Sequence, residues 1–377
     1  MITIRRATFL DKPEIYEFIQ QAYEGRWQFK IPERWEWEYI HNPFIGKIDL
    51  PVFIAVDETG KVVGQSCALV EQVKIGDDLY PLGWGVDAYV LPEYRSQGIG
   101  YELQKANDKA HELFMSLSMA GAVRKMKIDL GAVPLEPVPV YRRYLEFTPD
   151  IIRNAAIERV AQNQPSLRRW VSAGLRVTFL DRFLTWMKNK RREFGDHKLL
   201  QNLDPGLVLT EVDIFPEEID LLWERLSAKF YAIVRRDRTH LNWKYVEQPH
   251  MDYHRFIARR GGDACGYLIL RIAKPPERNI GVISDIFVDP ADGPAISTLL
   301  SFAVMYFREH RVAEIVAATT IPEYQRCLDE LEFAKMDEEH PVLHARVSST
   351  AIETALEPGR WFLGKSDHDW DQYPLAR

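Results

Sequence analysis

A weak internal repeat constrains the fold of this chain more than any other feature of its sequence. The segment 35–43, Trp-Glu-Trp-Glu-Tyr-Ile-His-Asn-Pro, is matched by 241–249, Leu-Asn-Trp-Lys-Tyr-Val-Glu-Gln-Pro, so that Trp37 corresponds to Trp243 at a separation of 206 residues. Three further segments recur in the same order, at separations of 203, 198 and 186 residues. A domain duplication followed by loop deletions in the second copy would shorten the separation between matched segments steadily in this way. The further matches are 53–55 with 256–258, 87–92 with 285–290, and 145–147 with 331–333.

The repeat predicts two similar domains, and the 377 residues are enough for two domains of ordinary size. Between the copies lies a basic segment whose apolar residues recur at helical spacing, which predicts a linker helix from Pro165 to Gly195. Such a helix suits packing between domains, and it also suits peripheral contact of residues 165–192 with a membrane, so both interpretations stay open. The expected parts are a first domain at 1–160, a basic amphipathic linker at 161–205, a second domain at 206–350 and a C-terminal tail at 351–377.

Each copy places strands in hairpins before a strand–helix–strand unit, which is typical of a mixed α/β (α+β-like) fold. We expect each domain to be a twisted, mostly antiparallel sheet flanked by helices, and the two domains to be joined by the linker helix. In the first copy we expect helices at 11–23, 33–41, 98–118 and 136–145, and strands at 2–6, 51–57, 62–74, 79–91, 126–131 and 155–160. In the second copy we expect strands at 254–260, 265–273, 281–289 and 313–319, and helices at 295–309 and 322–331.

Composition and charge exclude several classes of protein. Acidic residues (55) outnumber Lys and Arg (48), and the formal net charge of -7 argues against nucleic acid as a partner. The three Cys are too few and too scattered for a disulfide framework or a thiolate metal cage, so we expect no metal. The N-terminus lacks the features of a signal peptide, and no stretch approaches the roughly 20 apolar residues of a transmembrane helix. We therefore expect a cytoplasmic protein with no transmembrane segment; a homodimer stays open.

The most informative stretch is 86–103, where a β-type segment ends at Pro92 and an amphipathic helix begins after a glycine-containing turn. A turn of this kind presents successive backbone N–H groups at a helix N-terminus, where the helix dipole also favours negative charge. Gly98 and Gly100 lack a Cβ atom, so a diphosphate can approach the main chain closely. Arg95 adds a positive charge beside it. The stretch therefore predicts a cradle for a phosphate-bearing ligand.

The run Val90-x-Pro92-x-x-Arg95-x-x-Gly98-Ile99-Gly100 resembles motif A of the GNAT superfamily of acyl-CoA N-acyltransferases. Residues 4–11 are also similar to that family's first strand and turn. Residues 141–147 resemble its closing Tyr-x-x-Leu-Gly-Phe element, with one extra residue and a Glu in place of Gly. The resemblance implies a GNAT fold, acetyl-CoA or another acyl-CoA as co-substrate, and direct transfer of the acyl group to an amine. The residues it assigns to the cofactor are Tyr89, Val90, Arg95, Ser96, Gln97, Gly98, Ile99 and Gly100.

The resemblance also implies a tyrosine on the late helix that protonates the leaving thiolate. By position this is Tyr141, with Tyr144 as its competitor because of the extra residue. For the base that takes the amine proton, Asp87 is the candidate, since it lies two residues before Tyr89 and shares a strand face with it. Asp285 holds the matching place in the second copy, which favours a structural role for Asp87. Both roles stay open for that carboxylate.

The second copy has lost the cradle. Its matching region, 288–296, contains no Arg and no Gly-x-Gly, and Asp292 places negative charge where a phosphate would bind. Pro294 removes a backbone donor from the turn. We therefore expect the second domain to be a degenerate GNAT-like copy that binds no acyl-CoA.

The acceptor leaves the weakest trace in the sequence. Trp27 and Trp35 lie in the region that often lines the acceptor site of GNAT proteins, and Trp84 precedes the cradle, so we expect a small primary amine and slightly prefer an amino sugar. Core packing would explain the same tryptophans. Two other functions stay open: an aminoacyl-tRNA-dependent peptide-bridge transferase, which also uses two GNAT-like domains, and a non-catalytic CoA-binding or scaffold protein. The alternating carboxylates at 364–371 could complete a site for a cationic substrate or merely solubilise a terminus, and we interpret them as surface.

Overall fold

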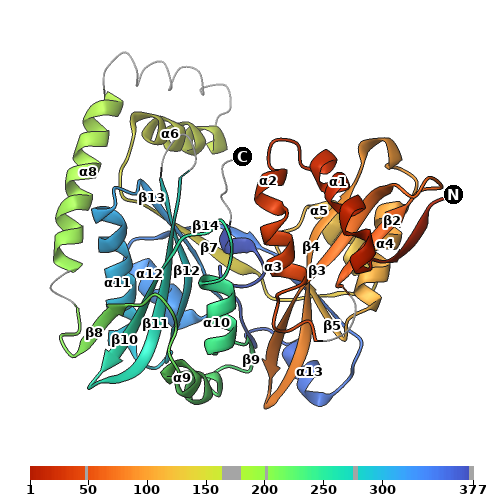
Figure 1. The fold of residues 1–377 in the computed structure, drawn as a ribbon. Helices are drawn as coiled ribbons and strands as arrows, with labels where there is room; N and C mark the ends of the chain where they lie inside the picture. Colours follow the sequence, from red (N-terminus) through yellow and green to blue (C-terminus); the bar gives the residue numbers. More distant parts are fainter. Residues whose placement is uncertain (47–49, 164–179, 200–202, 275–278, 373–377) are drawn as a thin grey trace.

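The computed structural model describes residues 1–46, 50–163, 180–199, 203–274 and 279–372. Two halves stand side by side, each built on one twisted sheet with helices on its faces (Figure 1). In the described residues, nine strands form the sheet of the first half and seven form the sheet of the second. The architecture is therefore the mixed α/β arrangement of two sheets that the repeat predicts.

The sheet of the first half follows the order β1-β2-β3-β4-β5-β15-β6, with β9 paired to β3 and β16 paired to β9. Its centre is the long antiparallel β3–β4 hairpin, which β5 joins in parallel. The strands are β1 (Thr3–Arg6), β2 (Val52–Val56), β3 (Val62–Ile75), β4 (Asp78–Val90), β5 (Leu113–Ser116), β6 (Val133–Pro134), β9 (Ala232–Val234), β15 (Val342–Ala345) and β16 (Trp361–Phe362). The helices beside this sheet are α1 (Lys12–Ala22), α2 (Trp27–Lys30), α3 (Glu33–Tyr39), α4 (Ile99–Lys109), α5 (Gly121–Asp129) and α13 (Thr350–Ala355).

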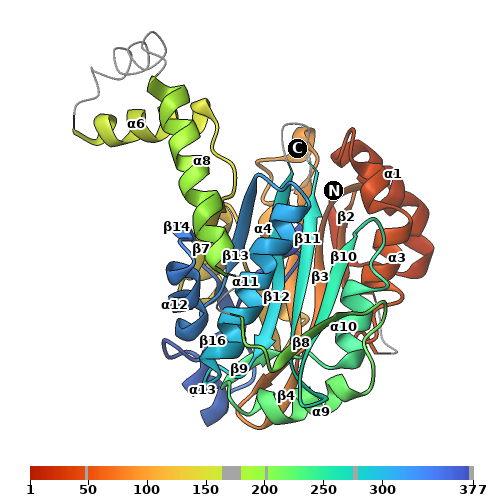
Figure 2. The same ribbon diagram turned by 90° about the vertical axis from the view of Figure 1, so that its left-hand side faces the viewer.

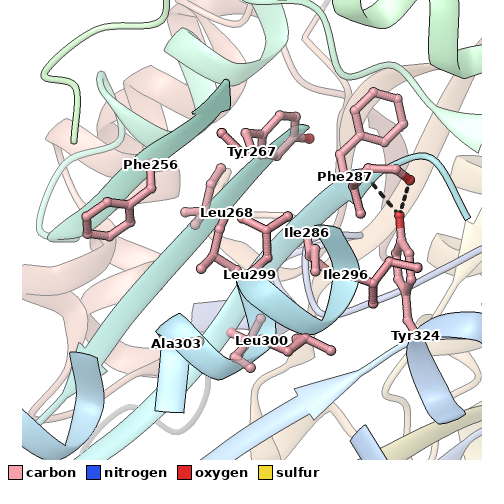
Figure 3. Packing of buried hydrophobic residues seen from close by; sticks show 14 of the residues in the cluster. Phe256, Tyr267, Leu268, Ile286, Phe287, Ile296, Leu299, Leu300, Ala303 and Tyr324 are labelled. Atoms are coloured by element: carbon pink, nitrogen blue, oxygen red, sulfur yellow. Dashed lines mark hydrogen bonds between the residues drawn. The ribbon is translucent and has the colours of Figure 1, made fainter. Parts of the chain in front are cut away.

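The sheet of the second half follows the order β14-β7-β13-β12-β11-β10-β8. Helix α11 covers one of its faces, where Leu299 and Leu300 join the same buried cluster as Leu268 and Ile286 (Figure 3). The strands are β7 (Val138–Tyr144), β8 (Leu207–Glu211), β10 (Tyr253–Arg260), β11 (Asp263–Ala273), β12 (Ile280–Val288), β13 (Glu314–Ala318) and β14 (Ala334–Glu339). The helices of this half are α9 (Glu218–Ser227), α10 (Arg238–Tyr245), α11 (Gly293–Glu309) and α12 (Pro322–Glu330).

Four elements of the first copy differ from the sequence prediction. The helix expected at 98–118 ends at Lys109, and β5 follows it. The strand expected at 126–131 lies mostly in α5, and the strand expected at 155–160 lies in α6 (Pro149–Asn163). The helix expected at 136–145 is β7, because Pro139 interrupts a helix and the flanking valines and tyrosines favour a pleated strand.

The two halves exchange a strand. Strand β7 comes from the first part of the chain, yet it pairs between β13 and β14 of the second sheet. In return β15, from the end of the chain, pairs between β5 and β6 of the first sheet. Each sheet is therefore completed by a strand from the other half, which links the folding of residues 1–160 to that of residues 206–350.

Trp37 and Trp243, the matched residues of the repeat, meet face to face between the halves. Their rings stack with centroids 4.6 Å apart and an interplanar angle of 15°. The Nε1 of Trp37 donates to the carbonyl oxygen of Trp243 at 2.9 Å, and the Nε1 of Trp243 donates back to that of Trp37 at 3.4 Å. Such a reciprocal contact is the signature of a two-fold axis, so α3 and α10 meet across a pseudo-two-fold axis of the molecule.

A buried ion cluster also joins the halves. Glu71 on β3 accepts a hydrogen bond from Trp84 Nε1 at 2.6 Å and lies 3.0 Å from both Lys244 Nζ and His240 Nε2 on α10. Burial opposes the charged carboxylate, but Lys244 and His240 outweigh this effect and lower the pKa of Glu71 to about 2. The carboxylate is therefore ionised at neutral pH and holds α10 against β3.

The linker is described in part. Residues 164–179, with the expected helix start at Pro165, lie outside the described residues. Helix α8 (Leu180–Leu199) runs along the outer side of the second half, contacts α11, and has α6 across one end (Figure 2). It does not end at Gly195 as predicted, since a glycine is tolerated within a helix. Within the described part of this helix, five apolar side chains are exposed: Leu180, Phe183, Trp186, Met187 and Phe194.

Candidate functional site

A gap opens between two parallel strands at the centre of the first sheet. Strand β4 pairs with β5 only from Leu82 to Trp84, and β4 then continues to Val90 with no further pairing to β5. Residues 85–88 of β4 line one side of a cavity, and residues 116–120, at the end of β5 and just beyond it, line the other. The cavity has a volume of about 1080 Å³ and continues to the wall formed by the second half. Divergent strands leave unpaired backbone groups that an extended ligand can use.

The predicted cradle lies at the end of this same strand. A short turn, Pro92–Tyr94, leads to an exposed loop at 95–98, and α4 begins at Ile99. Gly98 has a φ of 76°, and a Cβ atom at this position would meet no atom within 4 Å. The first amides of α4 have no acceptor within the helix, so they face the open side of the loop. The loop thus offers open backbone donors and room for a phosphate.

The arginine of the cradle does not extend into this space. Arg95 folds back over the ring of Tyr89, with its guanidinium carbon 5.1 Å from the ring centre, and its Nε donates to the carbonyl oxygen of Val90 at 3.0 Å. Its charge still lies beside the loop. The structure therefore brings all the residues predicted to bind cofactor into one region, from Tyr89 to Gly100.

Asp87 lies on the cavity wall at a β-bulge, where the pairing of β3 with β4 shifts and its φ is 49°. Its Oδ1 accepts from Lys30 Nζ at 2.5 Å and from the Tyr23 hydroxyl at 3.4 Å. Burial opposes the charge on Lys30, but Asp87 more than compensates and raises the pKa of that lysine. Asp87 is thus one half of a partly buried ion pair that faces the cavity.

The second half repeats this ion pair. Arg236, which stands 206 residues after Lys30, places its Nε 3.2 Å from Asp285 Oδ2. The pairing of β11 with β12 also shifts next to this aspartate. The carboxylate therefore belongs to the scaffold of both halves, and it borders an open cavity in the first.

Tyr141 lies away from this cavity. On β7, Val140 and Arg142 line the cavity, while the alternation of a strand sends Tyr141 to the opposite face. There it is 4% exposed and belongs to the hydrophobic cluster of the second half. Burial, with a contribution from Asp329, raises the pKa of its hydroxyl. The helix that follows β5 is α5, and its sequence contains no tyrosine.

The three tryptophans predicted to contact the acceptor do not line the described part of the cavity. Trp35 packs edge-on against Tyr16 and is 2% exposed, and Trp84 is fully buried with its Nε1 bonded to Glu71. Trp27 is half-buried on α2. The tryptophan that does line the cavity is Trp370, near the end of the chain.

The surface position expected for residues 364–371 is wrong, because the structure buries the C-terminal segment 361–372 between the two halves. Lys365, His368 and Asp369 all line the cavity with Trp370. His368 places its Nδ1 2.5 Å from Asp369 Oδ1 and its Nε2 3.0 Å from the carbonyl oxygen of Gly85 on β4. Burial opposes a charged imidazole, but Asp369 outweighs it and raises the pKa of His368. The tryptophan within this acidic run, Trp370, is the sequence signal that could have indicated burial.

The same segment fills the matching gap of the second sheet. There β12 pairs with β13 only from Ile280 to Val282, as β4 does with β5. Gly364 bridges to Thr319 just beyond β13, and the Thr320 amide donates to the carbonyl oxygen of Leu363 at 2.9 Å. The cavity left in this gap has a volume of about 20 Å³, against about 1080 Å³ in the first half.

Two more side chains occupy the second gap. The hydroxyl of Tyr324 on α12 donates to the carbonyl oxygen of Val288 at 2.6 Å and accepts from its amide at 3.0 Å (Figure 3). Asp292 caps α11, since its Oδ1 accepts from the Ala295 amide at 3.1 Å, and it also pairs with Arg260. The carboxylate of Asp292 therefore occupies the N-terminus of α11, where a phosphate would otherwise bind.

Comparison with known proteins agrees with this geometry. Residues 12–117 match the family profile described as Acetyltransferase (GNAT) family. A GCN5-related N-acetyltransferase from Anabaena variabilis has a similar fold, with a TM-score of 0.59, 11% identity, and coverage of 91% of this chain and 72% of that one. N-myristoyltransferase from Saccharomyces cerevisiae with bound myristoyl-CoA is similar at a TM-score of 0.55 and 11% identity, over 92% of this chain and 80% of that one.

A third similar structure is a probable N-acyltransferase from Enterococcus faecalis, with a TM-score of 0.55, 11% identity, and coverage of 92% of this chain and 72% of that one. A search of curated protein sequences gives no match.

Within the described residues, no helix has the length and apolar character needed to cross a membrane. The described residues also contain no group of three or more His, Cys, Asp or Glu placed to hold a metal ion.

Proposed function

We propose that this acyltransferase transfers an acetyl group from acetyl-CoA to a primary amine bound between the two halves. The match of residues 12–117 to the GNAT acetyltransferase profile and the fold shared with N-acetyltransferases support the proposal. The observation that carries the proposal is the contrast between the gaps. The gap of the first sheet is open and ends at an exposed phosphate cradle. The gap of the second sheet is filled by the chain's own C-terminal segment.

The residues present fit an acyl-CoA. The edge of β4 from Gly85 to Val90 would hold the pantetheine arm, and the amides of residues 95–100 would hold the pyrophosphate. When bound, the thioester supplies an activated acyl carbon: the amine forms a C–N bond to it, the C–S bond breaks, and the CoA thiolate leaves. The amine must be neutral to attack, so a group in the cavity must accept its proton.

For the proton transfers there is one candidate that faces the cavity and one that rests on the sequence alone. Asp87 faces the cavity and pairs with Lys30, so its carboxylate is placed to hold an ammonium group or to accept its proton. Tyr141 as the acid stays a prediction from the sequence, and the position of its side chain in the core of the second half argues against this role. The acceptor is proposed as a small amine, because side chains from β7, β13 and residues 365–370 bound the cavity on the side of the second half.

The test is release of free CoA thiol from acetyl-CoA by the full chain in the presence of a panel of primary amines. We expect amine-dependent release, with the acetylated amine found by mass spectrometry. Myristoyl-CoA in a parallel series reports the acyl chain length, because a neighbour in fold binds that ligand. Acetyl-CoA binding with no turnover on any amine would favour a CoA-binding scaffold. No binding, together with binding of charged tRNA, would favour the peptide-bridge transferase.

A further inference from the structure

We propose that the acceptor amine also carries a carboxylate, which Lys365 and Arg142 bind on the wall of the cavity contributed by the second half. This inference rests on the proposed acyl transfer, since it names the class of amine that the same cavity accepts.

Lys365 is a buried cation with few partners. Its side chain lines the cavity, and the residue is 5% exposed. The Nζ donates to the carbonyl oxygen of Trp370 at 3.3 Å and lies 4.3 Å from the centre of the Trp370 ring. No carboxylate of the described residues lies within 4.0 Å of it. An ammonium group has three donors, and a buried charge without a counterion is costly, so a ligand carboxylate would stabilise this position.

The titration of Lys365 agrees with this geometry. Burial lowers its pKa to about 8, although the more distant carboxylates of Asp371 and Glu339 act in the opposite direction. At neutral pH most of the molecules therefore still carry the charge. A bound anion would raise this pKa, because it would favour the protonated form.

Arg142 stands on the same wall. It extends from β7 into the cavity with its side chain 36% exposed. Its Nη1 lies 3.5 Å from the Tyr144 hydroxyl and 3.8 Å from Glu314 Oε2, both at the limit of a useful contact. A guanidinium has five donors in a planar fork that matches a carboxylate. Arg142 can therefore keep its contact with Glu314 and bind a second carboxylate.

Most other charged side chains that line the cavity are paired within the chain. Lys127 forms a buried ion pair with Asp108. Of the cavity carboxylates, Asp87 pairs with Lys30, and Asp369 contacts His368 and also lies 3.6 Å from Arg34. On the wall of the second half, the two cations Lys365 and Arg142 face one further carboxylate, Glu314, so the net charge of these described residues is positive. The phosphates of CoA are assigned to the cradle before α4, so this surplus faces the acceptor.

The experiment compares L-amino acids with their carboxamides as matched acceptors for the full chain and acetyl-CoA. The two members of a pair share the amine and side chain and differ in the anionic group. We expect at least one amino acid whose kcat/KM exceeds that of its amide by about tenfold or more, the effect of one lost charge-assisted contact. Lys365→Gln and Arg142→Gln should each move this ratio toward one. Lys190→Gln, at an exposed site on α8, is the matched control and should leave it unchanged.

Equal rates for acids and amides across the panel would overturn the inference while leaving acyl transfer intact. An equal loss on both members of each pair in Lys365→Gln and in Arg142→Gln would also overturn it. If acetyl-CoA binds but no amine reacts, the proposed function fails, and calorimetric titration of the same acids and amides into the CoA-bound protein decides the inference. Binding of an acid but not its amide, weakened tenfold or more by Arg142→Gln, supports it, and equal or absent binding overturns it.

Discussion

Exchange of one glycine of the cradle tests the acyl-CoA site with little disturbance of the fold. Gly98 has a φ of 76°, which L-residues adopt at a cost of about 1 to 2 kcal/mol. Gly60, in the turn between β2 and β3, has a φ of 88° and is equally open, with no atom within 4 Å of the place that a methyl group would take. Gly98→Ala and Gly60→Ala should therefore lower the free energy of unfolding by the same amount.

Only the exchange at Gly98 should weaken the binding of acetyl-CoA. The added methyl group at Gly98 enters the open space in front of the loop amides, where the pyrophosphate is proposed to bind. Hydrogen bonds to a charged group contribute about 1.5 to 3 kcal/mol each, so the loss of one such bond weakens binding by about tenfold or more. Gly98→Pro should abolish binding, because proline fixes φ near −65° and removes an amide donor.

The assay pairs two measurements on each variant. Calorimetric titration with acetyl-CoA gives the affinity, and urea unfolding gives the free energy of unfolding. We expect similar stability in Gly98→Ala and Gly60→Ala, and weak binding in Gly98→Ala alone. If Gly98→Ala binds acetyl-CoA as tightly as Gly60→Ala does, the cradle is not the phosphate site and the reasoning from its amides is refuted.

Three further exchanges test the contacts between the halves and the sequence-based assignment of the acid. Trp37→Ala should lower the free energy of unfolding by about 3 to 5 kcal/mol, because it removes a buried ring stacked on Trp243. Glu71→Gln should cost about 3 to 5 kcal/mol at pH 7, because it leaves Lys244 buried without its counterion. The pKa of Glu71 in the folded protein, about 2, lies below the unfolded value of about 4.3, so its contribution is present above about pH 4.3 and is lost as the pH falls toward 2. Tyr141→Phe should leave turnover unchanged, since the ring packs in the core on the face of β7 opposite to the cavity.

Each of these outcomes has a direct check. Urea unfolding reports the first two, and for Glu71→Gln it should show a shallower loss of stability between pH 5 and pH 2 than the unaltered protein. A cost below about 1 kcal/mol for Trp37→Ala would contradict the stacked contact. A marked fall in kcat for Tyr141→Phe, with unchanged affinity for acetyl-CoA, would restore Tyr141 as the acid.

The parts of the site that are local in sequence can be predicted, and the parts that depend on distant contacts cannot. The cradle is predictable because strand, turn and helix follow one another within residues 86–103 and their backbone geometry depends on Pro92 and Gly98. The repeat also predicts a pair, Trp37 and Trp243, that the structure brings into contact.

The strand exchange and the burial of the C-terminal segment could not be predicted in this way, because no local sequence pattern indicates them. β7 satisfies its hydrogen bonds equally well beside any strand with a free edge, so nothing in Val138–Tyr144 indicates a partner in the other half. The carboxylates of residues 367–371 suggest solvent, because isolated charges are rarely buried. Their counterions, Arg236, Lys244 and Arg34, lie far away in the sequence and become neighbours only in the fold.

We infer that the chain has one open acyl-CoA site, and that its own C-terminal segment fills the matching gap of the second sheet. Calorimetric titration of the full chain with acetyl-CoA tests it directly by counting sites. We expect one binding site per chain, and we expect Gly98→Pro to abolish it. Two sites per chain would contradict the filled second gap, and no binding would contradict the open first one.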